Sequence, residues 1–143
     1  FILYGRRDSG IRSIADIKGK KIAVTALGST TDYAARAILK HHSFDPDKDA
    51  SIVPLGSEGV FPALQRGSVD AAILWAPGFA VAEKLGMVRI QSLGDILELP
   101  GSGMVVSDQL IRENTVLIKK VLRGTLKGFQ YDMILGTSRR SSI

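Results

Sequence analysis

The stretch that decides the fold is GKKIAVTALGSTTD, residues 19–32. Its apolar run at residues 22–24 contains β-branched side chains and favours a short strand, which Gly28 brings to an end. The next three residues carry hydroxyl groups of the kind that cap helices: Ser29, Thr30 and Thr31. A helix that begins there directs free backbone N–H groups and the positive end of its dipole outward. The stretch therefore predicts a strand, a glycine turn and a helix start that suits an anion or a carboxylate-like group.

Strand and helix patterns alternate on both sides of this stretch. We expect strands at residues 1–4, 21–25, 51–55, 69–75 and 87–91. We expect one helical turn at residues 13–19 and helices at residues 30–42, 60–66 and 78–85. The run VDAAILW at residues 69–75 is almost entirely apolar, which is typical of a parallel sheet covered on both faces. The sequence thus predicts an α/β domain with a mostly parallel open sheet and helices on both faces.

The pattern changes after Ser92. We expect a loop at residues 94–103, a short strand at 104–107, a helical turn at 108–113 and a longer helix at 115–135. The longer helix carries apolar residues on one side and Lys or Arg residues on another, which predicts an amphipathic helix.

The composition is that of one ordinary globular core, and it excludes several kinds of chemistry. The chain has 143 residues, of which 45% are hydrophobic and 23% are charged. Because it has no cysteine, disulfides, thiolate metal sites and a cysteine nucleophile are excluded. The net charge of +5 is dispersed, and the densest basic groups lack interleaved aromatic residues, so we expect no nucleic acid partner. The chain starts within a predicted strand and without a signal-peptide pattern, so we expect a piece of a longer protein.

Sequence motifs for catalysis, nucleotide binding and metal binding are absent. The chain has no G-x-S-x-G, no G-x-x-x-x-G-K-[ST], no G-x-G-x-x-G and no H-E-x-x-H. His41 and His42 are neighbours, and neighbouring side chains on a helix diverge by about 100°, so they do not form a metal-ligand pair. Asp45, Asp47 and Asp49 alternate as in a calcium loop, but its sixth-position glycine and closing glutamate are missing. We therefore expect no catalytic residue, no metal and no cofactor.

Three polar turns that follow strands are candidate ligand contacts. They lie at residues 27–31, 56–60 and 75–78. In an open α/β sheet, ligands bind beyond the carboxyl ends of the strands, where such turns converge. The groups that we expect to face a ligand are hydroxyl or backbone donors and one apolar wall: Ser29, Thr30, Thr31, Ser57 and Trp75.

The same groups also have structural interpretations. Ser29 and Asp32 have the S-x-x-D spacing of an approximate capping box, although one cap leaves other N–H groups free for a ligand. For Trp75, core packing is the favoured interpretation, since tryptophan is highly buried on average. From the residues alone, we interpret Glu58 as structural.

Four segments occur in an order that resembles the periplasmic substrate-binding proteins of ABC importers for nitrate, sulfonates, taurine and thiamine-pyrimidine precursors. They are SIADIKGKKIAV (13–24), GSTTDYAARAIL (28–39), ALQRGSVDAAILWAP (63–77) and GSGMVVSDQLIREN (101–114). The pattern ALxxGxVDAA is a moderately specific mark of type II binding proteins, and the resemblance covers residues 8 to about 135.

In that family, two α/β lobes close on a small ligand. The resemblance implies that residues 1–107 form a ligand-binding lobe with both hinge strands, at 1–4 and 104–107. Residues 108–143 would be returning helices of an incomplete first lobe. The family's contacts come from turns that match these positions here: Gly28, Ser29, Thr30, Thr31, Gly56, Ser57, Glu58, Trp75 and Pro77.

The resemblance implies a solute-binding component of an ABC transporter that binds a small anionic or polar organic molecule between two lobes, without catalysis. The expected partners are that ligand and a transporter permease, at the periplasmic or extracellular face. Lipid anchoring and a homodimer of this chain are left open. Two alternatives are the effector-binding domain of a LysR-like regulator and a thiamine-pyrimidine synthesis enzyme, the latter disfavoured because that branch uses a cysteine-rich motif. Asn114-Thr115 stands where the family commonly has Asn-Pro.

Overall fold

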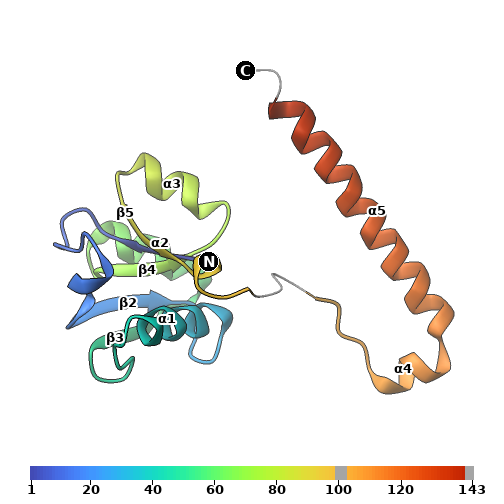
Figure 1. The fold of residues 1–143 in the computed structure, drawn as a ribbon, viewed down its shortest axis with the longest axis horizontal. Coiled ribbons are helices and arrows are strands. Elements are labelled where there is room, and N and C mark those ends of the chain that lie inside the picture. The colour runs from blue at the N-terminus through green and yellow to red at the C-terminus, as the bar shows by residue number, and fades with distance from the viewer. Residues whose placement is uncertain (99–102, 141–143) are drawn as a thin grey trace. The chain divides into compact units, whose positions relative to one another are not determined.

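A computed structural model describes residues 1–98 and 103–140, with side chains up to residue 131. The chain divides into two compact units, Phe1–Leu99 and Pro100–Ile143 (Figure 1). The described residues include no helix that combines the length and apolarity needed to cross a membrane.

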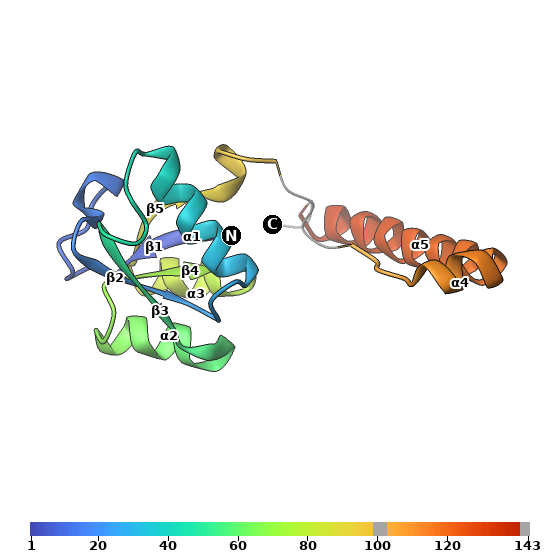
Figure 2. The same cartoon turned by 90° about the horizontal axis from the view of Figure 1, so that it is seen from below.

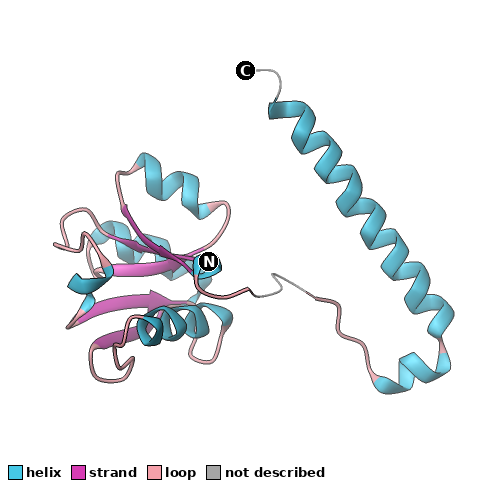
Figure 3. Ribbon diagram, in the orientation of Figure 1, coloured by secondary structure: helices cyan, strands magenta, loops and turns pink. Residues whose placement is uncertain are grey.

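The first unit is built on a five-stranded sheet in the order β3-β2-β4-β1-β5. Figure 3 draws the strands in magenta. The strands are β1 (Ile2–Gly5), β2 (Lys20–Val24), β3 (Ala50–Pro54), β4 (Ala71–Leu74) and β5 (Val88–Ser92). β2 pairs in parallel with β3 and β4, whereas β1 is antiparallel to both β4 and β5. All strands except β1 therefore run the same way, and the predicted mostly parallel sheet is confirmed.

Helix α1 (Thr30–His41) covers one face of this sheet. Its Ile38 and Leu39 are fully buried and join a cluster with Ile22 and Val24 of β2. Ala23, between them, belongs to the cluster on the opposite face, because successive strand side chains alternate between faces. The helical turn η1 (Ile14–Ile17) also contributes to the α1 side, as does η2 (Leu93–Asp95).

Helices α2 (Gly56–Arg66) and α3 (Gly78–Lys84) cover the other face. Figure 2 shows α1 and α2 on opposite sides of the strands. Leu64 of α2 and Ala82 of α3 are fully buried against Tyr4. The hydroxyl of Tyr4 donates a hydrogen bond to Glu83 Oε1 at 3.1 Å, which fixes α3 on the sheet. Helices on both faces were predicted, and this prediction is confirmed.

The start of α2 differs from the prediction. The helix begins at Gly56 rather than at residue 60, so Pro62 lies inside the helix and not in its first turn. The cause is tertiary: the backbone N–H groups of Leu55 and Gly56 donate to the carbonyls of Val24 and Thr25, each at 2.9 Å. These bonds attach the chain to the end of β2, and Gly56 adopts the positive φ of 70° that the turn requires.

The edges of the first unit bring distant residues together. Ile2 pairs with Ser92, and the N–H of Leu93 donates to the carbonyl of Phe1 at 3.0 Å. The segment between these residues therefore begins and ends at one place on the sheet.

The second unit contains α4 (Asp108–Glu113) and α5 (Thr115–Arg140). α4 has the predicted bounds, and the hydroxyl of Ser107 caps it by accepting from the N–H of Leu110 at 3.2 Å. α5 runs five residues past the predicted end at 135.

The predicted strand at residues 104–107 is wrong. Residues 103–107 form neither helix nor strand, and no strand of the described residues pairs with them. A strand exists through its ladder of hydrogen bonds, so an apolar run without a partner does not form one. Part of the predicted loop at 94–103 lies outside the described residues. The assignment of residues 1–107 and 108–143 to two lobes stays a prediction, while the compact units divide after Leu99.

Candidate functional site

The three predicted turns lie at one edge of the sheet. β3, β2 and β4 are neighbours and run in parallel, so their carboxyl ends lie together. The turns that follow these strands lead into α2, α1 and α3 respectively. In α/β sheets this edge is where ligands bind.

Thr25, the residue after β2, joins the starts of α1 and α2. Its N–H donates to Thr31 Oγ1 at 2.9 Å, and its hydroxyl donates to Ser29 Oγ at 3.1 Å. Its carbonyl accepts the N–H of Gly56 at 2.9 Å. The structure therefore brings the turn at Gly28 and the turn at Gly56 together around Thr25. Thr25 was not among the predicted site residues, although it is the first polar residue after the apolar run of β2.

The hydroxyl groups of Thr25, Ser29 and Thr31 form a triangle. Ser29 Oγ and Thr31 Oγ1 are 2.8 Å apart, and Thr25 Oγ1 lies 2.9 Å from Thr31 Oγ1. Thr31 is only 4% exposed, so its hydroxyl serves the turn itself. Ser29 also accepts the N–H of Asp32 at 3.3 Å, which confirms the predicted capping role. Ligand contact by these residues stays a prediction.

Two backbone donors at the start of α1 are unused. Within residues 1–98, neither hydrogen bonds of the backbone nor those of side chains provide an acceptor for the N–H groups of Thr30 and Thr31. The N–H of Gly28 is taken by Asp32 Oδ2 at 2.8 Å, and Gly28 has a positive φ of 75°. Thr30 is exposed. Both N–H groups therefore lack an acceptor at the positive end of a helix dipole, although Thr31 as a residue is only 4% exposed.

The predicted residues of the second and third turns lie at the same edge of the sheet, and they differ in how far they are exposed to solvent. Gly56, Ser57 and Glu58 form the exposed first turn of α2, whose N-cap Leu55 makes no side-chain capping bond. Trp75 is half-buried, and its carbonyl accepts the N–H of Gly78 at 2.7 Å. Pro77 is the exposed N-cap of α3. No hydrogen bond among the described residues joins Trp75 or Pro77 to the other two turns.

Two large apolar side chains are exposed on either side of the Gly28 turn. Leu27 is 60% exposed and Tyr33 is 50% exposed. The three turns themselves, residues 27–31, 56–60 and 75–78, contain no Lys, Arg or His. The edge therefore combines neutral N–H donors with apolar surface.

A hollow of about 340 Å³ lies between α2 and the β2–β3 side of the sheet, and Leu55 and Gly59, at the turn that follows β3, form part of its lining. Its lining includes Lys21, Val53, Ala63 and Arg66, and none of the nine predicted site residues.

The neighbouring histidines at the end of α1 and the aspartates of the following loop interact with nearby groups of the protein. The rings of His41 and His42 meet edge to face at 4.9 Å, and His42 Nε2 is 3.2 Å from Gln91 Oε1. Asp45 accepts the N–H of Asp47 at 3.0 Å and pairs with a lysine. That backbone hydrogen bond is the main cause that lowers the pKa of Asp45. The described part of the chain contains no group of three or more acidic or histidine residues arranged to hold a metal.

Residues 1–134 match the family model described as NMT1/THI5 like. The chain belongs to this family. The resemblance carried by the four segments is thereby confirmed.

Individual relatives cover different parts of the chain. The taurine-binding periplasmic protein of Escherichia coli K12 is 42% identical over 77 residues, which are 54% of this chain and 23% of that protein. A putative aliphatic sulfonates-binding protein of the same organism is 29% identical over 125 residues, 85% of this chain and 37% of that protein. Among solved structures, the periplasmic aliphatic sulphonate binding protein SsuA from Escherichia coli is similar, with a TM-score of 0.73 and 25% identity. That match covers 85% of this chain and 41% of SsuA, so the chain spans less than half the length of these relatives.

Proposed function

We propose that residues 1–107 of this NMT1/THI5 like chain form the ligand-binding lobe of a solute-binding component of an ABC transporter. The ligand would be a small sulfonate or taurine-like molecule, and the chain would bind it without catalysis. The observation that carries the proposal is the pair of unused N–H donors of Thr30 and Thr31, at the sheet edge where ligands of such folds bind. The taurine- and sulfonate-binding relatives support the choice of ligand.

In this proposal, each part of the edge has a separate task. The sulfonate oxygens accept from the two N–H groups, at the positive end of the α1 dipole. The hydroxyl triangle of Thr25, Ser29 and Thr31 holds the turn in shape. Leu27 and Tyr33 are placed to contact the alkyl part of the ligand. A second lobe would close over the ligand by a hinge motion that ligand binding favours.

Two of the similar proteins support a partner and a location, since the taurine-binding protein and SsuA are named as periplasmic. We propose a periplasmic location and a transporter permease as partner. Lipid anchoring and a homodimer of this chain stay open, as they were from the sequence. The relatives are named as binding proteins, which does not favour the regulator or the enzyme as an alternative.

The test is a thermal-shift panel on the full-length protein. The ligands are taurine, ethanesulfonate, nitrate, bicarbonate and a pyrimidine, each at increasing concentration. A ligand present at 100 times its Kd stabilises the native state by about 2.7 kcal/mol, which raises the melting temperature measurably. We expect taurine or ethanesulfonate to raise it, with calorimetry to confirm the affinity. An unchanged melting temperature with every ligand would refute the proposal.

A further inference from the structure

Asp32 is a nearly buried carboxylate directly behind the Gly28 turn. It is 5% exposed, and its Oδ2 accepts the N–H of Gly28 at 2.8 Å. Its Oδ1 accepts from Arg36 Nε at 2.9 Å, one helical turn along α1. Arg36 in turn donates from Nη1 to Asp47 Oδ1 at 2.8 Å. A continuous chain of bonds thus connects the turn to the loop that follows α1.

The group formed by Asp32, Arg36 and Asp47 has a net negative charge, and it adjoins the Gly28 turn. Asp32 and Asp47 carry two negative charges against the single positive charge of Arg36, and Asp32 is the member that contacts the turn. Glu58 adds another carboxylate at the same edge, in the first turn of α2. Because the three turns contain no cationic side chain, the groups of these turns that attract an anion are neutral N–H donors at the positive ends of helix dipoles.

This balance distinguishes anions by charge. A singly charged anion gains the two hydrogen bonds and the dipole at the cost of one repulsion from Asp32. For a doubly charged anion of similar shape, the attraction to the dipole and the repulsion from Asp32 both double, so the charge of Asp32 opposes the extra attraction that the second negative charge would otherwise gain. We propose that Asp32, which Arg36 holds in place, causes this edge of the sheet to bind singly charged anions such as sulfonates in preference to doubly charged anions such as sulfate. This inference rests on the proposed function.

The experiment compares ethanesulfonate with sulfate on the full-length protein, by calorimetry at low salt and neutral pH. The measured quantity is the ratio of the two Kd values. Asp32→Asn keeps an oxygen that can accept the N–H of Gly28 but removes the charge. We expect this variant to reduce the preference for ethanesulfonate by about tenfold, the order expected for one charge several ångströms away near a protein surface.

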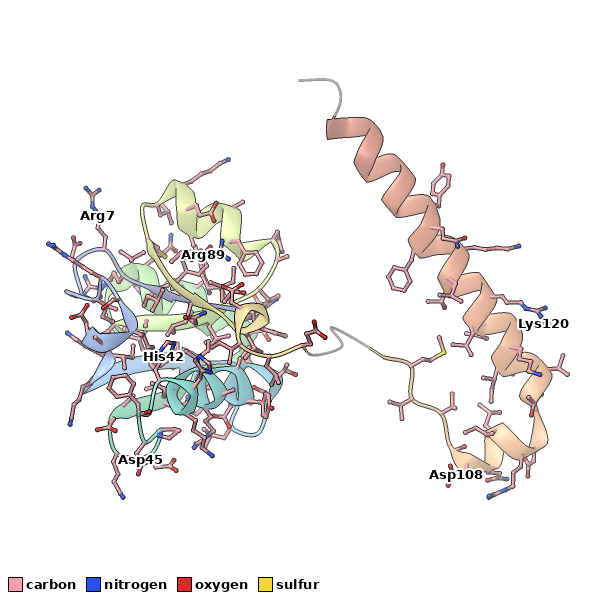
Figure 4. The ribbon with its side chains drawn as sticks, in the orientation of Figure 1. Arg7, His42, Asp45, Arg89, Asp108 and Lys120 are labelled. Atoms are coloured by element: carbon pink, nitrogen blue, oxygen red, sulfur yellow. The ribbon has the colours of Figure 1, made fainter. Side chains whose placement is uncertain are left out.

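Two further variants make the result decisive. Arg36→Gln removes the compensating cation, so it should increase the preference for ethanesulfonate, and it decides the matter if Asp32→Asn does not fold. Asp8→Asn is the matched control, because Asp8 is exposed and follows β1 at the opposite edge of the sheet. Figure 4 shows its neighbour Arg7 there. The control should leave the ratio unchanged.

The outcomes separate this inference from the proposed function. If ethanesulfonate and taurine do not bind the unaltered protein, the proposed function fails and the inference fails with it. If ethanesulfonate binds but the ratio is the same in the unaltered protein, Asp32→Asn and Arg36→Gln, only the charge selection is overturned. The same holds if Asp8→Asn changes the ratio as much as Asp32→Asn does.

Discussion

Replacing Thr25 with valine tests whether the two helix starts depend on a single hydroxyl. Thr25→Val keeps the backbone bonds to Thr31 and Gly56 but removes the hydroxyl that contacts Ser29 at 3.1 Å and Thr31 at 2.9 Å. A hydrogen bond contributes about 0.5–1.5 kcal/mol net, and valine is not a neutral replacement where a hydroxyl is bonded. Because Thr25 is half-buried, we expect a loss of about 1–2 kcal/mol in the free energy of unfolding.

The assay is urea unfolding of the full-length protein, followed by ligand titration. Thr30→Val is the matched control for stability, since the exposed hydroxyl of Thr30 makes no hydrogen bond among the described residues. It should change the free energy of unfolding by less than about 0.5 kcal/mol. Thr25→Val should also weaken sulfonate binding, because the starts of α1 and α2 lose their shared anchor. Equal stability of the two variants would refute the role assigned to Thr25.

Two further predictions concern turns of the first unit. Gly28→Ala should lower the free energy of unfolding, measured in urea, by about 1 kcal/mol. The cause is the φ of 75° at this position, because an added Cβ would meet nothing within 4 Å. Gly28→Asn should lower the free energy of unfolding clearly less, and equal losses would contradict this explanation. Asp16 accepts hydrogen bonds from the backbone N–H groups of Arg12 and Ser13. These bonds, that from Arg12 first, lower the pKa of Asp16 below its ordinary value of 3.8. Its folded pKa is depressed, so its contribution is complete above the unfolded pKa and is lost as the pH falls through the folded pKa. Thermal melts from pH 7 to pH 2 should therefore show the stability difference between the unaltered protein and Asp16→Asn shrinking below about pH 4, and a constant difference would contradict it.

The sequence predicted the elements whose signals are local. The apolar run of β2, the glycine at Gly28 and the hydroxyls after it specify a strand, a turn and a capped helix within a dozen residues. The apolar run of β4 lies in the middle of the sheet, as its composition indicated. Strand ends differ from the prediction by one or two residues, because terminal pairing depends on the neighbouring strand.

Features that depend on distant residues were not predictable in this way. The antiparallel direction of β1 between β4 and β5 arises from pairs such as Ile2 with Leu74, for which a single strand carries no signal. The start of α2 depends on the carbonyls of Val24 and Thr25, which lie some thirty residues earlier in the sequence. At the candidate site, the cap by Ser29 was visible in the sequence. The link from Asp32 through Arg36 to Asp47 was not, because it requires the loop after α1 to fold back on the helix.

The pairing of Ile2 with Ser92 has a practical consequence for protein engineering. Since both boundaries of the segment between them sit side by side, residues 2–92 can be cut out and exchanged as one cassette with the corresponding part of a relative. Such chimaeras need only two neighbouring junctions. They would carry the α1 and α2 starts, and any specificity encoded there, into a foreign scaffold.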